Sequence, residues 1–228
     1  MRPLLIWDID GTLLEPRGIG RAALNEAFAA MYGIAAGFDG LDFAGAADHD
    51  LWLQATAQSH VRPTADETAK FFITYRNRLE ALLTRTPLRP LPGVSTLIPL
   101  LSQMGWPMVL GTGNICAGAY AKLSAAGIAN YFPGGGFSQP NLTRADILQS
   151  AAAGRDPAMV IVLGDTPRDI HAAHANRFVI LGVATGRFSE ASLAQEGADL
   201  VLPNLGSPDQ VMMALTTLAN GRGPGVAP

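Results

Sequence analysis

Two aspartates near the N-terminus are the first residues whose spacing suggests chemistry. Asp8 and Asp10 follow the apolar run 4–7 and are separated by one residue. Residues i and i+2 of an extended chain point the same way, so both carboxylates would face one space at the carboxyl end of a strand. Gly11 then allows a sharp turn that aims backbone N–H groups into that space. The alternative is that Asp10 and Thr12 only form an Asx-type turn.

A second segment, residues 108–114, reads Met-Val-Leu-Gly-Thr-Gly-Asn. It predicts a strand that ends in Thr112, Gly113 and Asn114 just before a helix. A hydroxyl group and free N–H groups at a helix N-terminus form a site for an anion. Thr112 could equally be an N-cap of that helix.

A third segment, residues 160–169, reads Val-Ile-Val-Leu-Gly-Asp-Thr-Pro-Arg-Asp and predicts a strand followed by two carboxylates. Asp169 alone is typical of a helix N-cap, but Asp165 at the strand end does not need that explanation. On adjacent strands, Asp165, Asp8 and Asp10 would repel one another by about 4 kcal/mol per pair at 4 Å and an effective dielectric constant of about 20. Such a cluster requires a cation, and oxygen ligands beside a phosphate favour Mg²⁺.

The elements that position these residues alternate between short apolar strands and amphipathic helices. This rhythm is typical of a parallel sheet covered on both faces, so we expect a doubly wound α/β core. The expected strands are 4–9, 107–111, 159–163, 178–183 and 200–202, and the expected helices are 94–104, 115–126, 144–153, 169–176, 190–196 and 207–219.

Residues 16–88 break this rhythm and predict an inserted, all-helical cap domain. They contain no strong strand and three amphipathic helices, near 20–31, 48–57 and 64–84; in the last, Phe72, Leu79 and Leu82 with Leu83 form an expected buried stripe. The α/β core would then consist of residues 1–15 and 89–220. The Gly/Pro-rich tail, 221–228, is expected to be disordered.

Composition narrows the possible partners. A net charge of -3 from 16 basic and 19 acidic residues provides no basic stripe for nucleic acid or for a membrane surface. The charge-free stretch 90–121 is broken by prolines and glycines, so it predicts no membrane span. The single cysteine, Cys116, excludes an intramolecular disulfide and favours a cytoplasmic location. The oligomeric state is left open.

Taken together, the three motifs resemble the haloacid dehalogenase superfamily of hydrolases, specifically its phosphatases with a helical cap, such as those similar to phosphoglycolate phosphatase. Asp-x-Asp-Gly-Thr-Leu looks like the first motif of that family, Leu-Gly-Thr-Gly-Asn its second and Gly-Asp-Thr-x-x-Asp its fourth. In order and spacing, the motifs cover essentially the whole chain.

The resemblance implies a magnesium-dependent phosphatase that acts on a small phosphorylated metabolite. Asp8 would attack phosphorus, and Asp10 would protonate the leaving oxygen and then activate water. Gly11, Thr112, Gly113 and Asn114 would hold phosphoryl oxygens. The metal would be held by Asp8, the Asp10 carbonyl and Asp165, with Asp169 supporting the metal or its waters.

The third motif of the family usually contains a lysine, and here the chain departs from the pattern. Its only lysines are Lys70, in the expected cap, and Lys122. Lys122 follows Thr112 by ten residues, which would place it about 15 Å along a helix and out of reach. Arg144 has the right place in the order and is therefore expected to bind the phosphate, with a solvated surface arginine as the alternative.

Four further polar residues lie outside these motifs. Asp48 and His49 lie in a segment that resembles the loop that related caps lower over the site. They are candidates for substrate specificity, although Asp48 is better explained as a helix N-cap. His171 and His174 are expected to be surface histidines rather than metal ligands.

Several competing functions use the same scaffold. A dehalogenase would not need Asp10 or the metal site, and a phosphonatase would need a cap lysine, for which Lys70 is the only choice. A phosphomutase is harder to exclude. A non-enzymatic phospho-receiver domain is disfavoured by the large insertion and by the acid/base candidate two residues after the nucleophile.

Overall fold

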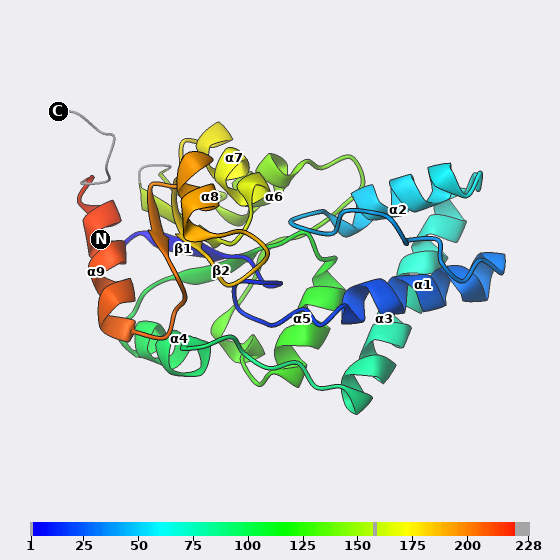
Figure 1. The fold of residues 1–228 in the computed structure, drawn as a ribbon, viewed down its shortest axis with the longest axis horizontal. Coiled ribbons are helices and arrows are strands. Elements are labelled where there is room, and N and C mark those ends of the chain that lie inside the picture. The colour runs from blue at the N-terminus through cyan, green and yellow to red at the C-terminus, as the bar shows by residue number, and fades with distance from the viewer. Residues whose placement is uncertain (1, 157–158, 222–228) are drawn as a thin grey trace.

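The computed structural model describes residues 2–156 and 159–221. Within these ranges, a parallel sheet of six strands forms the centre of the molecule, in the order β3-β2-β1-β4-β5-β6 (Figure 1). The strands are β1 (Leu4–Trp7), β2 (Met108–Gly111), β3 (Gly135–Gly136), β4 (Val160–Gly164), β5 (Val179–Val183) and β6 (Leu200–Leu202). The predicted doubly wound α/β fold is confirmed, with β1 between β2 and β4.

Helices cover both faces of the sheet (Figure 1). Leu5 and Trp7 pack into one apolar cluster and Leu4 and Ile6 into the other, so β1 is buried on both sides and its sequence is continuously apolar. One face is covered by α4 (Val94–Gln103), α5 (Cys116–Ala125) and α9 (Pro208–Ala219), and the other by α6 (Arg144–Ala151), α7 (Pro167–Ala175) and α8 (Glu190–Gln195).

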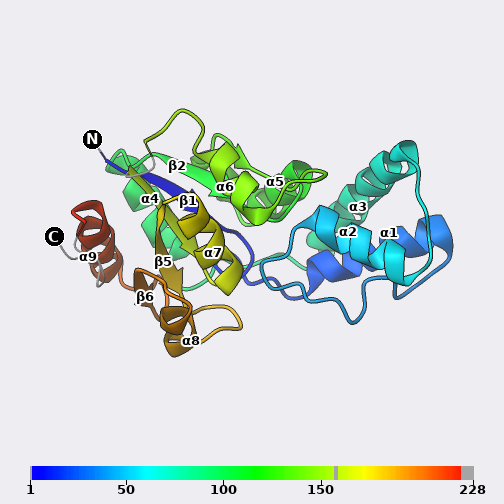
Figure 2. The ribbon, with the colours of Figure 1, turned by 90° about the horizontal axis from the view of Figure 1, so that it is seen from above.

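Three helices between β1 and α4 form a separate body beyond one end of the sheet (Figure 2). They are α1 (Ile19–Tyr32), α2 (Asp48–Gln58) and α3 (Ala65–Arg85). All three lie within the predicted insertion 16–88, which is called the cap below; its exact boundaries stay a prediction. Stacking of Trp52 on Phe71, with ring centroids 4.0 Å apart, joins α2 to α3 inside the cap.

The buried stripe of α3 is shifted from the predicted one. The helix begins after a capping box formed by Thr64 and Glu67. Its buried residues recur every four positions, whereas Phe72 and Leu82, which the sequence analysis assigned to the stripe, are only partly buried. The buried set is Phe71, Tyr75, Leu79 and Leu83.

One strand and one helix start differ from the predicted elements. The strand β3 was missed, and α7 begins at Pro167 rather than at Asp169. Among the described residues, no helix is long and apolar enough to cross a membrane. The predicted disordered tail, apart from Gly221, lies outside the described residues.

Candidate active site

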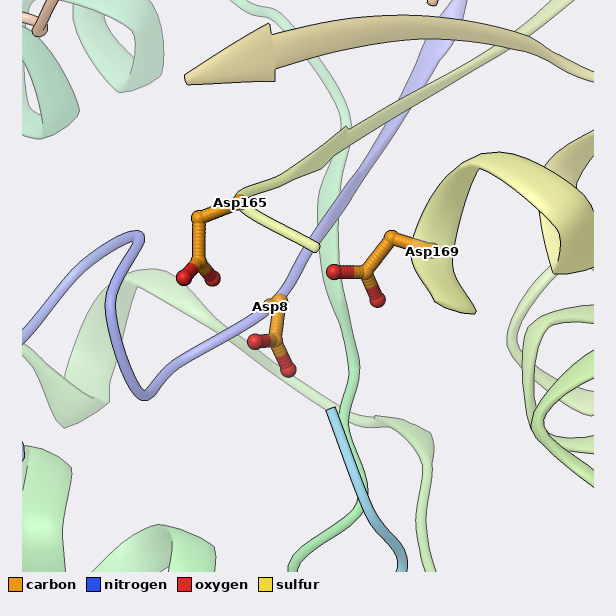
Figure 3. Close-up of side chains that lie close together, drawn as sticks. All are labelled: Asp8, Asp165 and Asp169. Atoms are coloured by element: carbon orange, nitrogen blue, oxygen red, sulfur yellow. The ribbon is translucent and has the colours of Figure 1, made fainter. Parts of the chain in front are cut away.

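Three buried carboxylates meet at the edge of the sheet where the parallel strands end (Figure 3). Asp8 follows β1, Asp165 follows β4, and Asp169 lies in the first turn of α7. One carboxylate oxygen from each lies within 4.8 Å of the others, and the residues are only 5, 4 and 0% exposed. The predicted approach of Asp8 and Asp165 is therefore present, but the third carboxylate of the cluster is Asp169 and not the expected Asp10.

Glycines make room for this cluster. Gly11 has φ +94°, a left-handed conformation, and a Cβ added there would overlap the carboxylate of Asp165. A Cβ on Gly164 would lie 2.6 Å from the Cγ atom of Asp169. Thr12 donates its hydroxyl hydrogen to Asp165 Oδ1 at 3.1 Å. The glycines that flank the motifs are thus required by close packing around the carboxylates.

Arg144 lies against this cluster. Its Nη2 donates to Asp8 Oδ1 at 2.8 Å and to Asp169 Oδ1 at 2.6 Å, and its Nε also donates to Asp169 Oδ1, at 3.0 Å. Burial alone would lower the pKa of Arg144, but the carboxylates of Asp169 and Asp8 raise it. Arg144 is the first residue of α6, after an N-cap by Thr143. The structure places it beside the expected nucleophile.

The electrostatics of the cluster fit a divalent cation. Burial raises the pKa of Asp8 to about 6; Arg144 opposes this, while Asp169 and Asp10 add to it. Burial, followed by the charges of Asp8 and Asp169, also raises the pKa of Asp165 well above its usual value. The one positive charge of the guanidinium therefore does not balance the negative charge of the carboxylates. A hard cation that prefers oxygen ligands would balance it.

Asp169 is less available to a metal than Asp8 and Asp165. Its Oδ1 accepts from Arg144, and its Oδ2 accepts from the N–H of Thr166 at 3.1 Å and from the Thr166 hydroxyl at 2.8 Å. Asp169 is the third residue in a capping box whose N-cap is Thr166, so its interpretation as the N-cap was wrong. Its position fits a supporting role.

Asp10 is bound by two donors, one from Asn114 and one from Lys122. Its Oδ2 accepts from Asn114 Nδ2 at 2.8 Å and from Lys122 Nζ at 2.6 Å. Asn114 also donates to Thr112 Oγ1 through its side chain at 2.8 Å and through its backbone N–H at 3.3 Å. The Asn114 amide is therefore committed to its neighbours and is not the expected phosphate ligand. The Thr112 hydroxyl still has its own hydrogen to donate, but Thr112 is not a helix N-cap, since α5 is capped at Ile115.

Lys122 lies in the site. The prediction from the sequence that it would be out of reach was therefore wrong. It is 4% exposed and contacts Asp10 and Asn114 Oδ1, the latter at 2.7 Å. The helix α5 begins only at Cys116, after a loop, so just six residues of helix separate its start from Lys122, a rise of about 9 Å. Helical side chains lean toward the N-terminus, and the long lysine side chain covers this distance.

The two glycines expected to bind phosphate through their N–H groups, Gly11 and Gly113, have different surroundings. The Gly11 N–H donates to the Leu14 carbonyl at 2.9 Å, so this donor is used within the turn. A Cβ on Gly113 would overlap the carbonyl oxygen of Ala46 in the cap. Gly113 thus allows the cap to approach the loop that carries Thr112.

Asp48 joins the cap to the core. The sequence analysis explained Asp48 as a helix N-cap, but Ala47 occupies the N-cap position of α2 and makes no side-chain hydrogen bond there. Asp48 Oδ2 accepts from the N–H of Ile115 at 2.8 Å, and the Asp48 N–H donates to the Gly113 carbonyl at 2.7 Å. Burial raises the pKa of Asp48 to about 6, although Lys122 opposes the shift. The Tyr75 hydroxyl is also hydrogen-bonded to this carboxylate.

His49 contacts the core outside the cavity described below. Its Nδ1 lies 3.0 Å from Ser138 Oγ, its backbone N–H donates to the same oxygen at 3.1 Å, and its ring lies 4.2 Å from that of Phe72. Burial lowers the pKa of His49 to about 4. These contacts give His49 a structural role at the cap–core contact and leave it no place on the cavity wall.

His171 and His174 lie on the surface, as expected. They lie 3.1 Å from Glu196 and 3.3 Å from Asp199, respectively.

A cavity of about 780 Å³ connects these groups with the cap. This volume is typical of a site for a small molecule. Core residues on its wall include Asp8, Asp10 and Lys122. The cap contributes Gly20, Arg21, Phe43, Asp48 and Tyr75. Sequence reasoning missed Lys122, Tyr75 and Arg21, since none belongs to a motif.

Solved structures with the same fold come from several bacteria. A hydrolase from Pseudomonas syringae has a TM-score of 0.69 and 19% identity, with 93% of this chain and 99% of that one covered. A β-phosphoglucomutase from Clostridium difficile has a TM-score of 0.71 and 16% identity, with 95% and 98% covered. CbbY from Rhodobacter sphaeroides, solved in complex with phosphate, has a TM-score of 0.68 and 21% identity, with 91% and 96% covered. At these identities, the likeness shows the fold.

Sequence comparison leads to the family. A curated relative, the probable phosphatase IndB of Dickeya dadantii (strain 3937), is 28% identical over 195 residues, which cover 82% of this chain and 83% of that protein. The model of the haloacid dehalogenase-like hydrolases matches residues 3–176, well over half of the chain. The chain therefore belongs to the haloacid dehalogenase-like hydrolases, in agreement with its three motifs.

Proposed function

We propose that this protein is a magnesium-dependent phosphatase that hydrolyses a small phosphomonoester through an aspartyl phosphate on Asp8. The observation that carries the proposal is the placement of Asp8 and Asp10 on the wall of one cavity, with an Asp8 oxygen held at 2.8 Å by Arg144. The relative named a probable phosphatase agrees with this activity.

In the first step, an Asp8 carboxylate oxygen attacks phosphorus and the bond from phosphorus to the leaving oxygen breaks. Asp10 gives a proton to that oxygen, so an alcohol leaves. In the second step, water attacks phosphorus, its proton passes to Asp10, and the bond between phosphorus and Asp8 breaks. The products are inorganic phosphate and the original Asp8 carboxylate.

Arg144 and Thr112 are proposed to bind the phosphoryl oxygens. Nη1 of Arg144 is buried and has no hydrogen-bond partner among the described residues. The Thr112 hydroxyl accepts from Asn114 and keeps its hydrogen for an oxygen of the phosphoryl group. Phosphoryl transfer depends mainly on positioning and charge stabilisation, which these donors would supply.

The carboxylates of Asp8 and Asp165, with the Asp10 carbonyl, would hold Mg²⁺. Asp169 would support the metal or its waters, because its oxygens are already hydrogen-bonded. Bound Mg²⁺ would screen the phosphoryl oxygens from the carboxylates and neutralise the charge that develops on them.

A small phosphorylated metabolite is the proposed substrate, and the cap side of the cavity would select it. A phosphonatase is disfavoured because Lys70 is exposed on α3 and is absent from the cavity wall. A phosphomutase shares the first step and is separated from a phosphatase by the fate of the aspartyl phosphate. A cytoplasmic location stays an expectation from the single, free Cys116.

The test is a panel of phosphorylated acids, sugar phosphates, nucleotides and pyrophosphate, assayed for phosphate release with Mg²⁺ and with chelator. We expect metal-dependent release, together with a phosphate on Asp8 that is labile to base and to hydroxylamine and that borohydride reduction and mass spectrometry can locate. Release of phosphate without any label on Asp8 would overturn the mechanism. Labelling and product isomerisation with little phosphate release would instead indicate a mutase.

A further inference from the structure

The buried ammonium group of Lys122 has two close partners in the core. It donates to Asp10 Oδ2 at 2.6 Å and to Asn114 Oδ1 at 2.7 Å. Asn114 Nδ2 donates to the same Asp10 oxygen at 2.8 Å, so the three side chains form a closed triangle of hydrogen bonds. A triangle in which each member contacts the other two fixes the orientation of all three.

The two oxygens of Asp10 are therefore not equivalent. Oδ2 accepts both hydrogen bonds of the triangle, whereas Oδ1 is buried and has no partner among the described residues. Asp10 lines the cavity, as does Lys122. Oδ2 is thus anchored to the core, and Oδ1 is the carboxylate oxygen that has no hydrogen-bond partner among the described residues.

The cap covers this triangle. A Cβ on Gly20, in the first turn of α1, would lie 3.6 Å from Lys122 Nζ and 3.9 Å from the Tyr75 hydroxyl. The carboxylate of Asp48 also lies near enough for the charge of Lys122 to act on it. Lys122 therefore carries its charge between a core carboxylate, Asp10, and a cap carboxylate, Asp48, and is itself only 4% exposed.

We propose that Lys122 is a positioning residue that anchors Oδ2 of Asp10, so that Oδ1 faces the leaving oxygen and transfers the proton. This inference rests on the proposed function, in which Asp10 protonates the leaving group. Arg144 serves the phosphoryl group from the other side of Asp8, so the two cations have separate tasks.

The dependence of rate on the leaving group reports this role. A leaving oxygen of low basicity needs little protonation, whereas a basic one depends on a well-placed acid. We expect Lys122→Met to lower kcat/KM about 100-fold for phenyl phosphate and at most about 10-fold for p-nitrophenyl phosphate. The ratio kcat/KM is used because it reports the formation of the aspartyl phosphate and excludes its later hydrolysis.

A double-mutant cycle tests whether Lys122 acts through Asp10. With Asp10→Asn already present, Lys122→Met should lower kcat/KM for phenyl phosphate by less than about 2-fold, because the acid it positions is gone. Lys70→Met, at the only other lysine, is the matched control and should leave both substrates unchanged. Lys122→Gln, which keeps one donor for Asp10, is run in parallel so that a folding defect of the methionine variant does not end the test.

Two results would overturn the inference. One is an equal loss of kcat/KM for both substrates in a folded Lys122 variant, and the other is the same loss in the Asp10→Asn background as in the wild type. Failure of the proposed function looks different, since the wild-type enzyme itself would then show no magnesium-dependent release of phosphate from either ester.

Discussion

The two sides of the candidate site are built differently. The core side is assembled from residues at or just after strand ends and helix starts. The cap side also includes two residues from later turns of helices, Lys122 in α5 and Tyr75 in α3, and it joins two different bodies. The core side consists of Asp8, Asp165, Asp169 and Arg144, and the cap side of Asp10, Asn114, Lys122, Asp48 and Tyr75. The core side concentrates negative charge, and the cap side pairs its carboxylates with an ammonium group. We therefore expect the core side to govern phosphoryl transfer and metal binding, and the cap side to govern proton transfer and closure.

The largest expected effect is on the core side, at the nucleophile. Asp8→Asn should lower kcat by at least about 10⁴-fold, because the amide cannot form the aspartyl phosphate. Steady-state phosphate release with p-nitrophenyl phosphate measures this, and circular dichroism checks that the variant is folded. Turnover near the wild-type level in the folded variant would move the nucleophile away from Asp8.

The second effect concerns the buried guanidinium. Arg144→Ala should raise KM and lower kcat, with a combined loss of about 100- to 1000-fold in kcat/KM, because the charge on the phosphoryl oxygens and on Asp8 is no longer compensated. The matched control is Arg76→Ala, at an exposed arginine of α3 whose Nε lies 3.8 Å from Glu80. If Arg144→Ala and the control behave alike, Arg144 has no role in the reaction.

The rise in Tm that Mg²⁺ causes should depend on residues of the core side and not on residues of the cap side. At about 100 times its dissociation constant, a metal that binds only the folded protein adds about 2.7 kcal/mol, which corresponds to a rise of about 5 to 10 °C in Tm. We expect this rise in the wild type and in Lys122→Met, and its loss in Asp165→Asn. Asp66→Asn, on the surface of α3, is the control. A full rise in Asp165→Asn would exclude Asp165 as a ligand.

The smallest expected effect is on the cap side, at Asp48. Its folded pKa of about 6 lies above the usual 3.8, so its favourable contribution is complete below about pH 4 and is lost as the pH rises through about 6. The loss amounts to about 3 kcal/mol, since one pKa unit is about 1.4 kcal/mol. The free energy of unfolding of the wild type, minus that of Asp48→Asn, should fall by most of this amount between pH 4 and pH 7 in metal-free buffer. Urea unfolding measures it, and a pH-independent difference would contradict the assignment.

The core side was predictable because strand periodicity and motif order fix it. Asp8 and Asp165 each follow a continuously buried apolar strand, and parallel strands bring their carboxyl ends to one edge. Arg144 was predictable only from its place in the motif order. Strand β3 was not predicted because Gly135 and Gly136 carry no side chains from which a pattern can be recognised.

The cap side was less predictable because it depends on where a helix begins and on contacts between distant segments. Counting residues from Thr112 placed Lys122 too far away, since a loop rather than a helix occupies residues 112–115. Local propensity suggested that Asp48 caps its own helix, but tertiary contacts bind its side chain to the N–H of Ile115 instead. Tyr75 looked like one more apolar position of α3.

Because Gly113 lies against Ala46, a single added methyl group at position 113 would push the cap away from the core. Gly113→Ala would insert a Cβ where the Ala46 carbonyl now lies, so cap and core would have to separate. No charge changes, and the reactive carboxylates keep their places in the sequence. Such a variant would give the enzyme with its cap displaced from the core, for crystallisation or for measuring how fast small molecules enter the cavity.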